Sequence, residues 1–416
     1  MPKAKSQKST TAKENGNSSV RVRMYRVGFG DCFLLTLGGK HHILVDCGVH
    51  AKGNVKSNGA SLIDKAFADI AEVTQKKLDV VIATHAHQDH VSGFGKFAEQ
   101  FAEFTVGEVW MPWTDDPSNA IARKWHQKKA AMVSLMRSRF TATMHPEAVA
   151  AADNAEPNAT AMKALRAGFG TGKVRYLKAG DKIDKPSEIA GLSAEILGPP
   201  QDQSFFTQMD PPASDHYLRM VNETGAGGST KPFPKWELNP SQLPAEWPQL
   251  DPKRIEKLKE QTEFQADAAA FSLDKVLNNT SVVALFNWHG KQLLFPGDAE
   301  YGDWSSWYKK RGSEVLSNIC FYKVSHHGSF NATPKGALSE MPQDGFAAML
   351  STQNKPWDSI PRKPLLAALE KRTGGKVARA DCVNITGAPN CSTKLPNVFT
   401  TGNKSQGEFW IDYEIK

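Results

Sequence analysis

The sequence of 416 residues lacks any apolar run close to the roughly 18 to 20 residues that a membrane helix needs. Its first residues also lack the apolar segment of a secretory signal. Cysteine is scarce, with five residues, and none of them has the spacing of a zinc site. These absences predict a cytoplasmic protein with no membrane partner. Thiols stay reduced in that compartment, so we expect no disulfide between Cys382 and Cys391, although the loop between them would allow one.

The excess of positive charge is small, because the formal net charge of the chain is only +7. Residues 1–19 hold four lysines and one glutamate with no large apolar residue after Met1, which is the composition of a disordered tail. This tail carries +3, which leaves +4 for the rest of the chain. Such a weak field is compatible with a nucleic-acid or nucleotide substrate but does not demand one. Protein partners cannot be read from the charge.

The most informative stretch is LDVVIATHAHQDHVSGFG at residues 78–95. Leu78 to Ala83 is a short apolar, β-branched run with no polar residue after Asp79, which predicts a strand buried on both faces. His85 and His87 then alternate along an extended segment, while Asp89 and His90 fall in the first turn of a helix expected to run to Phe104. Imidazoles and a carboxylate are ligands of zinc, and also of iron or manganese. The four residues together predict a metal site rather than surface histidines in a turn.

Two later segments end apolar strands with further candidate ligands. Asp298 follows the run LLFPG, and a carboxylate at the end of a buried strand is costly unless it is paired or bound to metal. The strand expected at Ile319 to Val324 leads into SHHGS. We choose His326 as the ligand because it follows the strand directly. His327 is the alternative ligand, or else a general acid toward the leaving group.

The segment THAHQDH resembles the HxHxDH signature of the metallo-β-lactamase-fold hydrolases. This resemblance implies an α/β fold, a four-layer αββα sandwich of two mixed sheets with outer helices, and metal-dependent hydrolysis. It also implies that Asp298 bridges two metals, that Asp46 supports the ligands from behind, and that Asp89, His327 and Asp46 are catalytic groups.

A narrower likeness concerns one branch of that superfamily. The segment VGFGDCFLLTLGGKHHILVDCG at 27–48 and the segment SHHGS are similar to the ComEC-like branch, the hydrolase part of the competence DNA-uptake protein. The chain departs from that branch at Phe29, where a glutamine is usual, so any contact made by that glutamine is in doubt here.

The superfamily's third motif, a histidine shortly before the strand that precedes Gly-Asp, is missing. Residues 277–281 read LNNTS instead, as in the ComEC-like branch. The resemblance then assigns two ligand sets, namely His85, His87 and Asp298, and Asp89, His90, Asp298 and His326. Asn278 or a water completes the first set, or His216 reaches it, or only one metal binds tightly. The expected cofactor is one or two divalent metals, zinc first and manganese as the alternative.

The sequence predicts one folded domain over residues 20–416 after the tail. Three antiparallel strands between Val20 and Gly48 open it, and an edge strand at Gly407 to Ile415 closes it. An insertion at about 201–275 is rich in Pro, Gly, Ser and Trp and too long for an ordinary connection. We expect it to cover the mouth of the active site, and the alternative is a surface decoration.

Three other histidines lie outside these motifs. His126 and His145 fall in a region of helical composition and have no companions at ligand spacing, so we expect them on helix surfaces. His289 is expected at the tip of a hairpin, away from the chemistry.

The function that these patterns favour is a phosphodiesterase or nuclease that uses a metal-activated hydroxide. The alternatives are hydrolysis of a small ester, lactone or β-lactam, and a scaffold that only binds nucleic acid or protein. A nuclease should lose affinity steeply with salt, a lactonase should have a narrow apolar pocket, and a scaffold should bind no stoichiometric metal.

Overall fold

The computed structural model of the chain gives two large sheets packed face to face. It describes residues 17–57, 59–139, 153–154, 158–208, 212, 276–353, 357, 360–383, 385, 391, 393–402 and 409–416. His145, His216, the first 16 residues of the expected tail and nearly all of the expected insertion after residue 208 lie outside these ranges.

The first sheet has eight strands, and both strand directions occur in it. In spatial order they are β16 (Phe399–Thr401), β17 (Trp410–Ile415), β1 (Val20–Tyr25), β2 (Cys32–Leu37), β3 (His41–Cys47), β6 (Lys77–Ile82), β7 (Thr105–Pro112) and β8 (Lys173–Leu177). The three antiparallel strands predicted between Val20 and Gly48 are β1, β2 and β3. Strands β3, β6, β7 and β8 are parallel, so their carboxyl ends share one edge of the sheet.

The second sheet has seven strands and is also mixed. In spatial order they are β15 (Val377–Arg379), β14 (Ala347–Leu350), β13 (Ile319–Lys323), β12 (Lys291–Phe295), β11 (Val283–Trp288), β10 (Leu192–Gly198) and β9 (Lys182–Asp184). A small separate ribbon joins β4 (Lys56–Ser57) to β5 (Ala60–Ser61).

The largest hydrophobic cluster lies between the two sheets. Phe33 of β2 meets Phe295 of β12 with ring centroids 5.9 Å apart, and Trp110 of β7 stacks on Phe286 of β11 at 6.0 Å. Side chains that alternate along each strand reach this core from one face. The opposite faces are apolar too, which requires a cover on each outer side.

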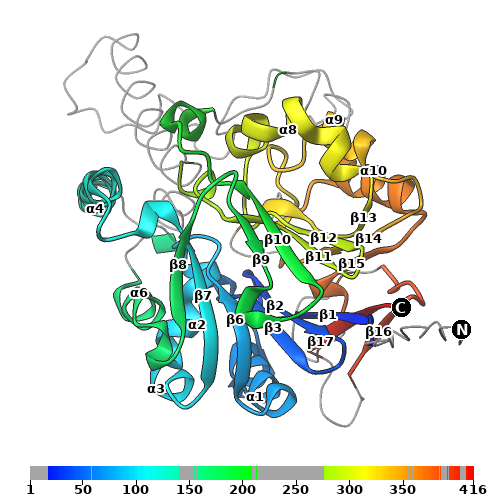
Figure 1. Cartoon of the computed structure of the whole chain (residues 1–416), viewed down its shortest axis with the longest axis horizontal. Coiled ribbons are helices and arrows are strands. Elements are labelled where there is room, and N and C mark those ends of the chain that lie inside the picture. The colour runs from blue at the N-terminus through cyan, green and yellow to red at the C-terminus, as the bar shows by residue number, and fades with distance from the viewer. Residues whose placement is uncertain are drawn as a thin grey trace, which may run out of the picture.

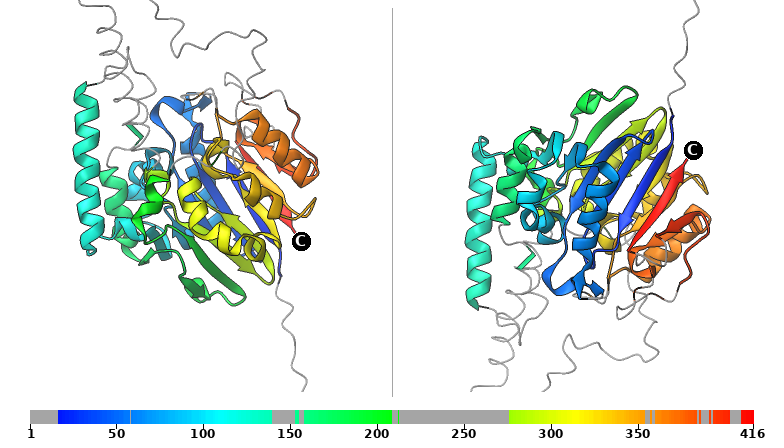
Figure 2. Two further views of the ribbon diagram at one scale, coloured as in Figure 1. Left: turned by 90° about the horizontal axis from the view of Figure 1, so that it is seen from above. Right: turned by 90° about the horizontal axis from the view of Figure 1, so that it is seen from below.

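Helices provide this cover on both sides (Figure 1). The outer face of the first sheet carries α1 (Leu62–Thr74), α2 (Gln88–Lys96), α3 (Ala98–Phe101) and α6 (Ala159–Arg166). The outer face of the second sheet carries α8 (Tyr301–Leu316), α9 (Lys335–Glu340) and α10 (Lys363–Thr373). A long helix, α4 (Ala120–Arg139), runs along the flank of the molecule (Figure 2). The predicted four-layer αββα fold is therefore confirmed.

Two sequence expectations were wrong in this part of the chain. The last strand, β17, is not at the edge, because β16 pairs with its free side while β1 pairs with the other. Cys382 and Cys391 form a disulfide, with Cα atoms 4.7 Å apart. A backbone hydrogen bond that joins the two ends of this loop, in which the Cys391 amide donates to the Asp381 carbonyl at 2.9 Å, brings the two cysteines together. None of the described helices is both long and apolar enough to cross a bilayer.

Candidate metal centre

The candidate ligands gather where strands of both sheets end. His85 and His87 follow β6, Asp89 and His90 lie in the first turn of α2, and Asp298 follows β12. A backbone hydrogen bond of 2.8 Å from the Val282 amide to the Thr84 carbonyl ties the loop before β11 to the loop after β6. Two segments 198 residues apart therefore meet at one edge of the sandwich.

Four buried side chains form the centre of the cluster, namely Asp89, His90, Asp298 and His327, with ligand atoms all within 4.8 Å of one another. Asp298 Oδ2 lies 3.0 Å from His90 Nε2 and 3.1 Å from His327 Nε2. Asp89 Oδ2 lies 3.1 Å from His327 Nε2 and 3.8 Å from His90 Nε2. The two carboxylates thus point at the same small volume as the two imidazoles.

His85 and His87 form a second group beside this one. Both are buried, and His85 Nε2 lies 2.9 Å from His87 Nδ1, so two donor nitrogens converge. The rings of His85 and His90 are 4.2 Å apart, which places the pair next to the four-residue cluster. Five of the six predicted ligands are thus brought together, and the sixth, His326, is not part of this group.

The structure favours His327 over His326 as the ligand. Both lie in the short turn Ser325–Gly328 with left-handed backbone, φ +44° and +50°, so neighbouring side chains leave the turn in different directions. His327 Nδ1 donates to the Ser351 carbonyl at 2.9 Å, which leaves Nε2 facing Asp89 and Asp298. Order along the chain could not decide between two adjacent histidines, because the turn geometry decides it.

His326 instead points to a neighbouring polar group that contains Asn278. Its Nε2 lies 3.3 Å from Asn278 Nδ2, and its Nδ1 lies 3.2 Å from the buried carboxylate of Glu300. Asn278 donates to Glu300 at 2.9 Å, while its own Oδ1 is buried and has no hydrogen-bond partner among the described residues. The amide is therefore oriented by Glu300, with a free oxygen available as a ligand.

Asp46 holds His90 in its orientation, as the resemblance implied. Its Oδ2 accepts from His90 Nδ1 at 2.8 Å and from the Thr84 hydroxyl at 2.7 Å, and its Oδ1 accepts from the Thr84 amide at 2.8 Å. This contact directs His90 Nε2 toward the cluster. Gly48 explains the close approach, because a Cβ there would lie 2.4 Å from the Asp89 carbonyl carbon and the His90 nitrogen.

A buried lysine that sequence reasoning missed completes the charge balance. Lys323 is 2% exposed, forms an ion pair with Asp31, and lies 3.1 Å from Asp298 Oδ1. It also donates to the Gly297 carbonyl at 2.8 Å. A signal existed for both missed residues, because Lys323 interrupts the apolar run ICFYKV and Asp31 belongs to the segment VGFGD.

Phe29, the departure from the ComEC-like pattern, packs against the site. Its ring centroid lies 4.3 Å from that of His327 and 4.8 Å from that of Trp357. Phe29 is 1% exposed, so it makes an apolar wall behind a candidate ligand where a glutamine would have offered a hydrogen bond.

The protonation of the histidines follows from their surroundings. Burial lowers the pKa of His87 to about 3 and that of His85 well below its usual value. Burial also lowers the pKa of His327, but the surrounding carboxylates, Asp298 foremost, overcome this and raise it to about 10. The pKa of His90 is raised in the same way, and the pKa of Asp298 is held well below its usual range by the two imidazoles and Lys323 against the opposing effect of burial.

The donor set fits a divalent cation. Asp89 and Asp298 are both ionised and converge, and Asp89 Oδ1 is buried without a hydrogen-bond partner among the described residues. Imidazoles and carboxylates are the ligands that zinc and manganese accept. His85 and His87 are neutral and suited to one ion, while Asp89, His90, Asp298 and His327 suit another. That Asp298 also reaches the first ion, as the resemblance implies, stays a prediction.

Metal binding is expected to release protons. His90 and His327 carry a proton each in the metal-free chain, and they must lose it to become ligands, so about two protons should leave per chain. The apparent metal affinity should therefore rise with pH. Calorimetric titration with zinc in two buffers of different ionisation enthalpy measures the number released. Release of no protons would contradict the assignment of these two imidazoles as ligands.

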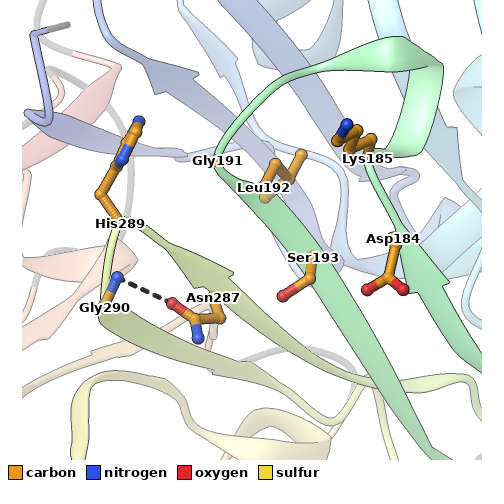
Figure 3. A pocket seen from close by; sticks show the side chains of 8 residues that line it. All are labelled: Asp184, Lys185, Gly191, Leu192, Ser193, Asn287, His289 and Gly290. Atoms are coloured by element: carbon orange, nitrogen blue, oxygen red, sulfur yellow. Dashed lines mark hydrogen bonds between the residues drawn. The ribbon is translucent and has the colours of Figure 1, made fainter. Parts of the chain in front are cut away.

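The other histidines lie apart from the cluster. His126 is 30% exposed on α4, with Nε2 3.0 Å from Asp115 Oδ1, so it pairs with an acid rather than standing free on a helix surface. His289 lies in the β11–β12 turn, as expected. It borders a surface hollow of about 450 Å³, whose lining includes Asp184, Lys185 and Asn287 (Figure 3). Asp298 follows the opposite end of β12, so this hollow is remote from the candidate ligands.

The geometry defines the class of the protein: an αββα sandwich with a histidine and aspartate metal site at the ends of its strands. The model of the Metallo-beta-lactamase superfamily matches residues 25–139, the part of the chain that carries the HxHxDH loop. This match covers well under half of the chain, and with the fold it makes the chain similar to the metallo-β-lactamase superfamily, whose members are mostly hydrolases. The narrower ComEC-like likeness stays a prediction.

The solved structures that match this chain do so at low sequence identity and with TM-scores below 0.5. The metallo-beta-lactamase fold protein YhfI from Bacillus subtilis is 11% identical, with 86% of this chain and 96% of that chain covered and a TM-score of 0.34. The metallo hydrolase Igni18 from Ignicoccus hospitalis is 10% identical, with 89% and 97% covered and a TM-score of 0.35. CmlA, a diiron beta-hydroxylase from Streptomyces venezuelae, is 14% identical, with 86% and 52% covered and a TM-score of 0.37. No curated protein matches the chain.

Proposed function

We propose that this protein is a divalent-metal-dependent phosphodiesterase. The observation that carries the proposal is the presence of two adjacent donor sets, since His85 and His87 converge at 2.9 Å beside the buried cluster of Asp89, His90, Asp298 and His327. Two adjacent ions suit the in-line displacement of phosphodiester hydrolysis, because they neutralise both the attacking and the leaving oxygen.

The side chains around the cluster have separate tasks in this proposal. Divalent ions bound here would acidify a water and neutralise charge on the phosphoryl oxygens. Asp46 fixes His90 through its Nδ1, and Ser351 fixes His327 through its Nδ1, so that both Nε2 atoms face the reacting centre. His327, His90 and Lys323 together keep Asp298 ionised, and Phe29 excludes water from behind His327.

The finer parts of the proposal rest on sequence. The likeness of VGFGD and SHHGS to the ComEC-like branch supports a nucleic-acid or nucleotide substrate, that is, a nuclease. The ligand types support zinc as the metal, with manganese second. We place the protein in the cytoplasm and assign it no membrane partner.

The proposal is tested by substrate choice in the metal-loaded protein. Bis(p-nitrophenyl) phosphate should be hydrolysed after addition of zinc or manganese, and a chelator should abolish the activity until metal is restored. Hydrolysis of p-nitrophenyl acetate or a lactone with no turnover of the diester would show a small-ester hydrolase instead. Stoichiometric metal without turnover of any of these substrates would also contradict the proposal.

A further inference from the structure

The disulfide between Cys382 and Cys391 is partly exposed, so a reductant in solution can reach it. It closes residues 382–391 into a loop, here called the cystine loop. Disulfides in cytoplasmic proteins are usually transient and redox-sensing, because glutathione and thioredoxin keep most thiols reduced there. In the cytoplasmic location that we propose, this bond is therefore expected to form and break with the redox conditions.

A buried arginine connects the cystine loop to the other end of the second sheet's strand β14. Arg26 is fully buried and donates through Nη1 to the carbonyl of Val383, the residue after Cys382. Its Nη2 donates to Gln353 Oε1 at 3.1 Å. One guanidinium therefore bridges the start of the cystine loop and the segment that follows β14.

The segment that follows β14 also holds one of the candidate ligands. The Ser351 carbonyl accepts from His327 Nδ1 at 2.9 Å, and this bond leaves Nε2 of the ring facing Asp89 and Asp298. Residues 351–353 are at most 2% exposed, and a close-packed segment does not shift without moving its neighbours. A continuous series of contacts therefore runs from the disulfide to the metal centre.

We propose that Cys382 and Cys391 form a redox switch that controls metal binding at the candidate centre. Two glutathione thiols supply two electrons and two protons, the S–S bond becomes two thiols, and the glutathione leaves as its own disulfide. The cystine loop then opens more often, because the cross-link no longer restricts it. Each opening takes the Val383 carbonyl from Arg26, and a buried guanidinium that loses an acceptor is costly, so Arg26 and the segment after β14 move.

This switch goes beyond the proposed function, because it concerns metal binding whatever the substrate. The test measures zinc affinity by competition with a chromophoric chelator, before reduction and after reduction and removal of the reductant. Reduction should weaken zinc binding about fivefold or more, the usual range for coupling between two sites. The double variant Cys382→Ser/Cys391→Ser should bind zinc as weakly as the reduced wild type under both conditions.

Cys320→Ser is the matched control, because it removes a free, half-buried cysteine on β13 and should keep the full redox response. Equal zinc affinity of the oxidised and the reduced wild type would overturn the inference. Additional zinc bound by the reduced wild type and not by the double variant would overturn it too. That result would show a metal site made by the thiols with Asp381, whose ligand atoms lie within 4.8 Å of one another.

Gln353→Met tests the route through Arg26. This variant keeps the disulfide and a similar side-chain volume but removes the acceptor of Arg26 Nη2. Its zinc affinity should no longer respond to reduction. A response as large as that of the wild type would exclude this route and overturn the inference.

Hydrogen exchange of the full chain gives a readout that does not depend on activity. Reduction should speed exchange of the amides in residues 349–353 as well as in residues 380–383, and should leave strands β10 and β11 unchanged. Faster exchange in residues 380–383 alone would show that the loosening stops at the cystine loop. The inference would then be wrong, because the metal centre would not sense the disulfide.

Discussion

Replacing Asp298 with alanine is expected to lower kcat/KM about a thousandfold or more, because it removes several kcal/mol of charge stabilisation by the metals. Asp298 Oδ2 lies within 3.1 Å of both His90 Nε2 and His327 Nε2, so this carboxylate lies at the centre of the four-residue cluster. Its loss should also leave less than the wild-type amount of metal bound. Atomic emission measures the bound metal, and turnover of the diester measures the loss of kcat/KM.

Asp184→Ala is the control for Asp298→Ala. Asp184 is exposed and borders the hollow at the other end of the second sheet (Figure 3). The Asp184→Ala variant should keep the activity and the metal content of the wild type. Thermal unfolding of the metal-free proteins then shows whether Asp298→Ala still folds. Wild-type turnover by a folded Asp298→Ala variant would rule out hydrolysis at this centre.

The location of Asp298 illustrates what local sequence patterns could predict. The carboxylate at the end of β12 and the HxHxDH loop after β6 were predicted because buried strands that end in polar ligand types are rare without a metal. The two β-sheets followed from the alternation of apolar residues and from the family resemblance. Each of these features depends on residues that are close together along the chain.

The features that could not be predicted depend on contacts between distant segments. Whether His326 or His327 faces the metals is decided by a left-handed turn and by the Ser351 carbonyl, 24 residues further along the chain. The edge of the first sheet is decided by β16, a strand of only three residues. Lys323 interrupts the apolar run ICFYKV, but its role depends on Asp31, which lies in the first hairpin of the other sheet, so the run alone does not indicate which charge the lysine balances.

The second large expected effect is a loss of stability when Lys323 is replaced. Lys323→Met is expected to lower the free energy of unfolding of the metal-free protein by about 3 to 5 kcal/mol, as for breaking a buried ion pair from one side. The methionine fills a similar volume but leaves Asp31 and Asp298 buried without their shared cation. Denaturant unfolding at pH 7.5 measures the loss, with the exposed Lys310→Met on α8 as the control.

The pH and metal dependence of this loss distinguish charge from packing. Burial lowers the pKa of Lys323, but Asp31 and Asp298 overcome this and raise it above its usual value. The stabilisation from Lys323 is therefore complete below the ordinary lysine pKa of about 10.4 and is lost only as pH rises through the raised value. The titration of Lys323 should therefore leave the loss of unfolding free energy in Lys323→Met unchanged between roughly pH 6 and 9, because both limits lie below the ordinary lysine pKa.

Bound zinc should reduce the loss of unfolding free energy in Lys323→Met, because the ion supplies positive charge to Asp298. A loss equal to that of Lys310→Met, or one that zinc leaves unchanged, would mean that Lys323 does not balance the charge of the ligands.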